Sequence, residues 1–449
     1  MSERGGRAAE HGGASSVSET LVLPNAPTDR AEHLQTLAQL LGFLRRDQEL
    51  TRADLMRLSG LSRGVVSQRV GQLVELGLVE EVGLAASTGG RAPQLFRFRG
   101  TVGRLLAVSA GATSVLVAIT DLNGRILRED RADLDISDGP ERYLGDVEQM
   151  AEALLDDPGL DPVWGIGIGL PGPIEFTSGR PTSPPIMPGW DGYDVRHRFT
   201  ARFGAPTWVD NDVNVMALGE LRAGLGRGVD DMVYVKIGTG IGAGLASRGA
   251  IHRGAQGAAG DVGHVAVVDS SPVTCRCGNK GCLETLAGGA AIIRDAYAAV
   301  NAGAEGTLAD LVRMRDRLTV AGVGRAAQQG DPVALRLLAG SGTLVGEMLA
   351  TLVSFYNPAL VVLGGSVAEA RGAFLAGVRE EVYRRSLRLA TRDLRIEVST
   401  LGASAGLIGA AALALNELFV PTRLEEWIAQ GLPERSPASV SRHVQGVVS

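Results

Sequence analysis

Three cysteines and a histidine are the clearest group of residues that could do chemistry in this sequence. Cys275, Cys277 and Cys282 are the only cysteines of the chain, and His264 precedes them by eleven residues. Four nitrogen and sulfur ligands are the usual set for tetrahedral structural zinc, and two glycines between the last two thiols allow a tight turn. We therefore expect one zinc ion per chain at these four residues. The alternative is that the cysteines are small buried side chains beside an unrelated histidine.

A polar segment and a glycine-rich segment form a second group. The segment "VDNDVNVMALGE" places Asn211 and Asp212 where a strand-like run changes to a helix-like one. An amide and a carboxylate fixed in a cleft can pair with several sugar hydroxyls at once. Taken alone, Asp212 could equally be the N-cap of a helix. The turn "GTGIG" that begins at Gly238 could hold a phosphate, although a single glycine-rich turn is weak evidence for that.

The N-terminal part has the pattern of a small DNA-binding module. Leucines recur at helical spacing from residue 34, Thr51 and Asp54 resemble a capping box, and Ser62 is suited to cap a third helix that would stop at Gly77. Two short alternating runs around a glycine-rich loop follow, and this order predicts a winged helix-turn-helix. The residues expected to contact DNA are Ser62, Arg63, Ser67, Gln68, Arg69 and, in the wing, Arg91. The alternative is a helical dimerisation module with a solvated polar face.

Charge and composition are compatible with this organisation. The chain has 449 residues and a net charge of −6, yet residues 30–99 contain ten arginines and seven acidic residues, a net charge of +3. The overall composition, with 45% hydrophobic and 21% charged residues, excludes a largely disordered chain. The sequence contains no uncharged apolar run of the roughly 18 residues that span a membrane, and its N-terminus has no apolar signal segment. We expect a cytoplasmic protein with no membrane partner.

Alternating strand-like and helix-like segments beyond residue 100 predict an α/β architecture. We predict a leader, a DNA-binding domain, a larger ligand-binding domain of two lobes with a closing helix, and a tail without assigned structure. The expected bounds are 1–28 for a disordered leader, 29–99 for the winged helix-turn-helix, 100–420 for the larger domain, with lobes at 100–225 and 226–400 and the closing helix at 405–419, and 421–449 for the tail.

Several motifs resemble the ROK family of sugar kinases and sugar-responsive repressors. They are "GAAGDVGH", "CRCGNKGCLE", "VDNDVNVMALGE", "KIGTGIGAGL" and "LGGSV", and the resemblance covers residues 31–418. It implies a two-lobed, actin-like fold of the sugar-kinase type. It also implies sugar contacts from Asn211, Asp212, Asp261, His264 and Glu284, with zinc fixing the loop behind the pocket.

Three positions depart from the pattern of that family. Asp261 and Pro185 stand where the family usually has Glu and Asn, which affects the choice of sugar. Ser109 replaces the Asp of the kinase turn D-x-G-x-T, which helps to hold ATP and its metal. Because phosphoryl transfer relies on charge stabilisation, we expect no enzymatic activity. ATP binding stays open, and Asp212 would be the catalytic base if the protein were a kinase.

These residues and motifs are compatible with two functions. The first is a transcriptional regulator, most simply a repressor, that binds operator DNA as a homodimer or homotetramer and responds to a sugar or sugar phosphate. The second is an ATP-dependent sugar kinase with an added DNA-binding module.

Overall fold

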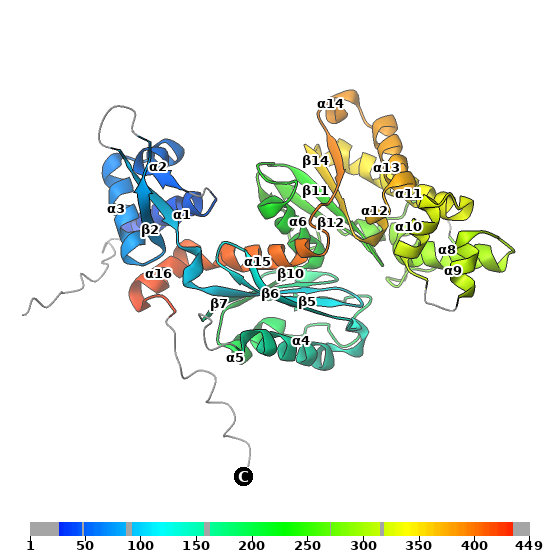
Figure 1. Ribbon diagram of the computed structural model, residues 1–449, viewed down its shortest axis with the longest axis horizontal. Helices are drawn as coiled ribbons and strands as arrows, with labels where there is room; N and C mark the ends of the chain where they lie inside the picture. Colours follow the sequence, from blue (N-terminus) through cyan, green and yellow to red (C-terminus); the bar gives the residue numbers. More distant parts are fainter. Residues whose placement is uncertain are drawn as a thin grey trace, which may run out of the picture. The chain divides into compact units, whose positions relative to one another are not determined.

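The computed structural model describes residues 27–46, 49–86, 92–156, 162–269, 271–314 and 318–433. These residues form two compact units (Figure 1). The first contains the N-terminal elements up to Phe98 together with residues 420–432, and the second contains Arg99–Phe419. The chain therefore passes from one unit to the other twice. Arg91 and nearly all of the expected leader lie outside the described residues.

The first unit combines helices with a small antiparallel sheet of strand order β1-β3-β2. Its elements are α1 (Pro27–Arg46), β1 (Leu50–Thr51), α2 (Arg52–Ser59), α3 (Arg63–Glu75), β2 (Val79–Leu84), β3 (Gln94–Phe98) and α16 (Pro421–Gln430). Three helices followed by a β-hairpin are the order that the sequence predicts for a winged helix-turn-helix.

Local capping interactions define the helices of this unit. Thr51 and Asp54 form a capping box at the start of α2, and the Oγ of Ser62 accepts a hydrogen bond from the backbone N–H of Val65 at the start of α3. Gly60 ends α2 in a left-handed conformation that favours glycine. The predicted helix starts at these positions are confirmed.

A C-terminal helix belongs to this first unit, in the tail segment for which the sequence predicts no structure. Helix α16 packs on α1. It starts with Pro421 at a first-turn position, and it buries Leu424, Trp427 and Ile428 at the spacing of one helix face. The face is only three residues long, which is too short to produce a clear hydrophobic period in the sequence.

The first lobe of the larger unit is built on a mixed five-stranded sheet of order β10-β7-β4-β5-β6. Its strands are β4 (Arg104–Ala110), β5 (Val115–Asp121), β6 (Ile126–Ala132), β7 (Val163–Leu170) and β10 (Thr207–Asn211). Helices α4 (Pro140–Leu155) and α5 (Val195–Phe203) cover one face, and α15 (Ser404–Leu418) covers the other (Figure 1). Strands β4, β7 and β10 are parallel, so their carboxyl ends meet at one edge of the sheet.

The second lobe has its own five-stranded sheet of order β13-β12-β11-β14-β15. Its strands are β11 (Met232–Ile237), β12 (Ile241–Ser247), β13 (Ala250–Ile251), β14 (Leu360–Gly364) and β15 (Arg395–Val398). One face packs on α6 (Asp212–Ala223), and an apolar core joins the other face to helices α7 (Leu283–Ala287), α8 (Gly289–Asn301), α9 (Thr307–Arg313), α10 (Val320–Gln328), α11 (Pro332–Tyr356), α12 (Ser366–Glu369) and α13 (Gly372–Arg385). The short helix α14 (Arg388–Thr391) lies beside α11.

Helix α6 connects the two lobes and packs very closely against α15. A Cβ atom on Gly219 would lie 2.1 Å from the carbonyl oxygen of Ala405, and one on Gly409 would lie 1.7 Å from that of Val215. Only glycine allows this approach of the two helix backbones. The start of α6, which carries the candidate sugar-binding residues, is therefore held firmly against α15.

Helix α11 is long and apolar enough to cross a membrane by length and composition alone. Half of its most apolar window is buried within the protein, where it packs against α13. This burial is typical of a core helix.

Candidate functional site

A cleft of about 1130 Å³ lies between the two lobes of the second unit. The first lobe contributes the turn after β4 and the start of α6, and the second lobe contributes the glycine-rich turn between β11 and β12. All five candidate sugar-binding residues line this cleft: Asn211, Asp212, Asp261, His264 and Glu284. Residues from distant parts of the sequence are therefore brought to one cavity.

Both ends of the Asn211 side-chain amide form hydrogen bonds with backbone groups. Its Oδ1 accepts hydrogen bonds from the backbone N–H groups of Val213 and Asn214, and its Nδ2 donates to the carbonyl of Gly172 at 2.8 Å. Asn211 is therefore the N-cap of α6, and the alternative that Asp212 is the cap is wrong. Asp212 occupies the first position of the helix, with its side chain free to interact elsewhere.

Asp212 forms an ion pair with Lys236, a residue that the sequence patterns did not single out. The Nζ of Lys236 lies 2.5 Å from Oδ2 of Asp212, and their side chains are 24% and 7% exposed. Lys236 is on β11, which belongs to the second lobe, so this pair joins the two lobes across the floor of the cleft. A charge this well buried requires a partner of opposite sign.

A second ion pair joins the two lobes. The Nε of Arg253 donates to Oδ2 of Asp210 at 2.8 Å, and the guanidinium lies 3.8 Å from the centre of the Phe176 ring. Oδ1 of Asp210 accepts from the amide of Asn214 at 3.0 Å. This network fixes the end of β10, and with it the segment that bears Asn211 and Asp212. The sequence offered no local signal for it, because Arg253 lies 43 positions after Asp210.

The four candidate metal ligands come together beside the cleft. The Nδ1 of His264 lies 3.5 Å from Sγ of Cys275, and the Sγ atoms of Cys277 and Cys282 are 3.7 Å apart. One ligand atom from each of the four residues lies within 4.8 Å of the others. In a tetrahedral zinc site with ordinary bond lengths the ligand atoms are about 3.5–3.8 Å apart, so the donor set and its spacing fit a metal ion.

The pKa values of the three cysteines are shifted in different directions. Burial raises the pKa of Cys275 to about 12 and raises that of Cys282, whereas a backbone hydrogen bond from Asn279 lowers the pKa of Cys277. Thiols with raised pKa values stay protonated at neutral pH unless a metal displaces the proton, so metal binding would release protons here.

Asp261 and Glu284 lie on either side of the imidazole of His264. Oδ1 of Asp261 is 3.9 Å from Nε2, and Oε1 of Glu284 is 3.8 Å from Nδ1 and 3.3 Å from Sγ of Cys275. A Cβ on Gly240 would lie 2.7 Å from Oε2 of Glu284, so the glycine-rich turn leaves room for this carboxylate. The metal ligands and the candidate sugar contacts thus form one connected group.

The turn that resembles the kinase phosphate turn is only partly directed at the cleft. Gly111 and Thr113 line the cavity. Ser109 is 7% exposed on β4, and a Cβ on Gly406 of α15 would lie 2.0 Å from its Oγ. The hydroxyl of Ser109 therefore packs against α15.

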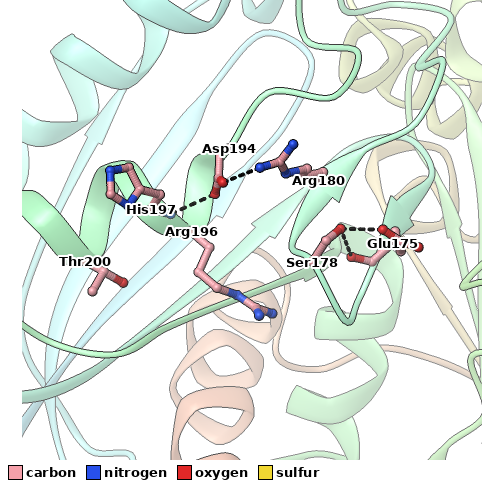
Figure 2. Close-up of a pocket in the computed structure, with 7 residues that line it drawn as sticks. All are labelled: Glu175, Ser178, Arg180, Asp194, Arg196, His197 and Thr200. Atoms are coloured by element: carbon pink, nitrogen blue, oxygen red, sulfur yellow. Dashed lines mark hydrogen bonds and ion pairs between the residues drawn. The ribbon is translucent and has the colours of Figure 1, made fainter.

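A smaller hollow of about 590 Å³ lies on the first lobe beside α5 (Figure 2). Arg180 and Asp194 lie 2.5 Å apart as an ion pair, and Asp194 also caps α5 through the backbone N–H of His197. Oγ of Ser178 donates to Glu175. These side chains are thus paired with one another.

The candidate DNA-contacting residues of α3 fall on two different faces. Arg63 and Gln68 are exposed, Ser62 is the exposed N-cap, and Ser67 is partly exposed. Arg69 is only 9% exposed, and its Nε donates to Oγ1 of Thr36 in α1. The expectation that Arg69 contacts DNA is therefore not met by its position, because helical spacing turns it toward α1.

Comparisons with known proteins cover both units. The model of the ROK family matches residues 105–417, and that of the MarR family matches residues 37–92. The xylose repressor of Caldicellulosiruptor bescii is 30% identical over 372 residues, which are 82% of this chain and 92% of that protein.

Two solved structures extend the comparison. A ROK family transcriptional regulator, described as a homologue of the E. coli MLC protein, shares the fold with a TM-score of 0.76 at 24% identity, covering 89% of this chain and all of the other. A ROK family glucokinase from Streptomyces griseus, solved with glucose and AMPPNP, has a TM-score of 0.62 at 30% identity, covering 70% of this chain and 99% of the other. The kinase-like part and the added N-terminal module are thus both matched.

Proposed function

The chain belongs to the ROK family, and from this we propose that it is a sugar-responsive transcriptional repressor. The carrying observation is the combination, in one chain, of a winged helix-turn-helix with an exposed Arg63 on α3 and a cleft that holds the candidate sugar contacts. The match to the xylose repressor of Caldicellulosiruptor bescii covers 82% of this chain and 92% of that protein. The effector would be a sugar or sugar phosphate, and the target a two-fold related operator bound by a homodimer or homotetramer in the cytoplasm.

We propose that the cleft binds its ligand without phosphorylating it. Asp212 is held by Lys236, and the hydroxyl of Ser109 lies against α15 where the related kinases have a carboxylate. Asp212, Asp261, His264 and Glu284 would accept and donate hydrogen bonds to sugar hydroxyls. Asn211 would contribute mainly by capping α6.

We propose zinc as the metal of the cysteine and histidine cluster. It would supply a fixed positive charge and a cross-link, which is a structural role because four protein ligands leave no open position. His264 and Glu284 would then be held in place behind the ligand.

The chain path supports a connection between sugar binding and DNA binding. Helix α15 packs on α6, whose first turn carries Asp212, and α16 follows it in the sequence and belongs to the DNA-binding unit. We propose that the α15–α16 segment carries this connection.

The proposal is tested by selecting DNA with the purified full chain from duplexes that contain a randomised centre. We expect one two-fold related sequence to be enriched, and we expect one member of a panel of sugars and sugar phosphates to change its affinity. The same ligand should raise the free energy of unfolding by RT ln(1 + [L]/Kd), and with it the melting temperature. If no sequence is enriched, the regulator function is wrong. The kinase function is favoured instead if the wild-type protein phosphorylates a sugar with ATP and Asp212→Ala abolishes that activity.

A further inference from the structure

The buried guanidinium of Arg69 connects the core of the DNA-binding unit to an exposed glutamine on α3. Its Nε donates to Oγ1 of Thr36 at 3.1 Å, and its Nη1 donates to Oε1 of Gln68 at 3.0 Å. Oγ1 of Thr36 in turn donates to the backbone carbonyl of His33 at 2.9 Å. The three hydrogen bonds share Thr36 and Arg69, so they form a continuous network from the backbone of α1 to the amide of Gln68.

This chain of hydrogen bonds fixes which end of the Gln68 amide faces outward. A guanidinium can donate hydrogen bonds but cannot accept them, so the atom that faces Arg69 must be the amide oxygen. The NH₂ group is then on the solvent side of α3, where Gln68 is exposed. Arg69 itself is held by its hydrogen bond to Thr36. Burial lowers the pKa of its guanidinium, and the nearby charge of Glu32 in α1 partly offsets that shift.

The orientation of the amide determines which base edge it can recognise. A free glutamine recognises adenine with both atoms, because the oxygen accepts from N6 and the nitrogen donates to N7. A glutamine whose oxygen is turned inward offers only donors. In the major groove guanine presents two acceptors, O6 and N7, and is the best partner for such a group.

We propose that Arg69 is a positioning residue that holds Gln68 as a donor, so that Gln68 reads guanine rather than adenine in the operator. This inference rests on the proposed DNA-binding function. The role of Arg69 is thus indirect: it sets specificity through Gln68 without reaching the DNA.

The test compares selected sequences for the full-length wild-type chain and four variants, using duplexes with a randomised centre. In the wild type we expect one position of each half-site to favour guanine over adenine roughly tenfold. Gln68→Ala should remove the preference at that position alone. Arg69→Met, which keeps the apolar stem, should weaken the guanine preference and bring adenine to a comparable frequency at the same position.

Thr36→Val and Arg57→Met complete the design. Thr36→Val removes the hydroxyl of α1 that accepts the hydrogen bond from Arg69. We expect it to weaken the guanine preference at the same operator position, as Arg69→Met does. Arg57 is an exposed arginine of α2 that pairs with Asp54, so Arg57→Met is the matched control for loss of charge, and it should leave every base preference unchanged.

The outcomes separate this inference from the proposed function. Suppose that the wild type selects a sequence, and that Arg69→Met and Thr36→Val keep the same guanine preference. This result would overturn the role of Arg69 and leave the regulator function intact. Adenine at the Gln68-dependent position in the wild type would also overturn it. Circular dichroism of each variant shows whether the helices of the DNA-binding unit are retained. If Arg69→Met unfolds, the base preference of Thr36→Val tests the role of Arg69 instead.

Discussion

The ammonium of Lys236 lies 2.5 Å from Oδ2 of Asp212, across the cleft between the two lobes of the larger unit. The carboxylate of Asp212 is thus already paired with a lysine of this chain. One ion pair therefore bears on two properties, the stability of the larger unit and the side chains that the cleft offers to a ligand.

Removing one partner of this pair should destabilise the larger unit. In Lys236→Met the carboxylate of Asp212 is left buried without its partner, so the free energy of unfolding should fall by about 3 kcal/mol. The double variant Lys236→Met with Asp212→Asn should lose much less than the sum of the two single variants. Urea unfolding of all four proteins measures the coupling, and strict additivity would show that the pair contributes nothing.

Placing a carboxylate at position 109 should not create a kinase. In Ser109→Asp the longer charged side chain must fit where Oγ now packs against Gly406. The expected result is a lower melting temperature and no ATP-dependent phosphorylation, because overpacking and a buried unpaired charge both cost stability. A coupled ATPase assay over a sugar panel is the measurement. Turnover in this variant at an unchanged melting temperature would contradict the placement of the serine.

Metal removal should affect the sugar site. We expect one zinc per chain by elemental analysis, and Cys277→Ser should lose the metal together with most sugar affinity, since the same loop carries His264 and Glu284. Ser178 lines the smaller hollow on the first lobe and is not part of the metal cluster, so Ser178→Ala is a suitable control. This variant should keep both the zinc and the sugar affinity. Native sugar affinity in metal-free protein would show that zinc does not organise the pocket.

The sequence predicted well what depends on neighbouring residues and poorly what depends on distant ones. The capping box at Thr51 and the helix start at Ser62 were predictable because each is decided within three residues. The cysteine cluster was visible because its ligands lie close together in the chain. Lys236 was missed because its partner is 24 positions away on another element, and the pattern "KIGTGIG" directs attention to its glycines.

Arg69 illustrates the same limit within a correctly predicted element. A polar residue in a recognition helix is normally expected to face DNA, and only the position of α1 shows that this arginine is directed inward. Helix α16 was missed for a related reason. Its three buried side chains need α1 as a partner, and that helix lies at the opposite end of the sequence.

The exposed arginine of α3 should contribute directly to DNA binding. Arg63→Ala should weaken binding to the selected duplex by roughly 1–3 kcal/mol if it contacts a base, or lower the salt dependence by about one charge if it contacts phosphate. Titrations at several salt concentrations distinguish these results. Arg57→Ala, at an exposed arginine of α2, is the matched control for this substitution. Unchanged affinity at every salt concentration would remove Arg63 from the interface.

Helix α16 should be needed for the stability of the DNA-binding unit, although it comes from the far end of the chain. Leu424 is fully buried, so Leu424→Ala should lower the free energy of unfolding of that unit by about 2–5 kcal/mol and reduce DNA binding in parallel. Glu425→Gln removes only the partly exposed ion pair with Arg30 and should change the stability by less than about 1 kcal/mol. Sugar affinity, measured by calorimetry, should stay native in both variants, because the cleft lies in the other unit. Loss of sugar binding in Leu424→Ala, with the DNA-binding unit still folded, would show that α16 also supports the cleft in the absence of DNA.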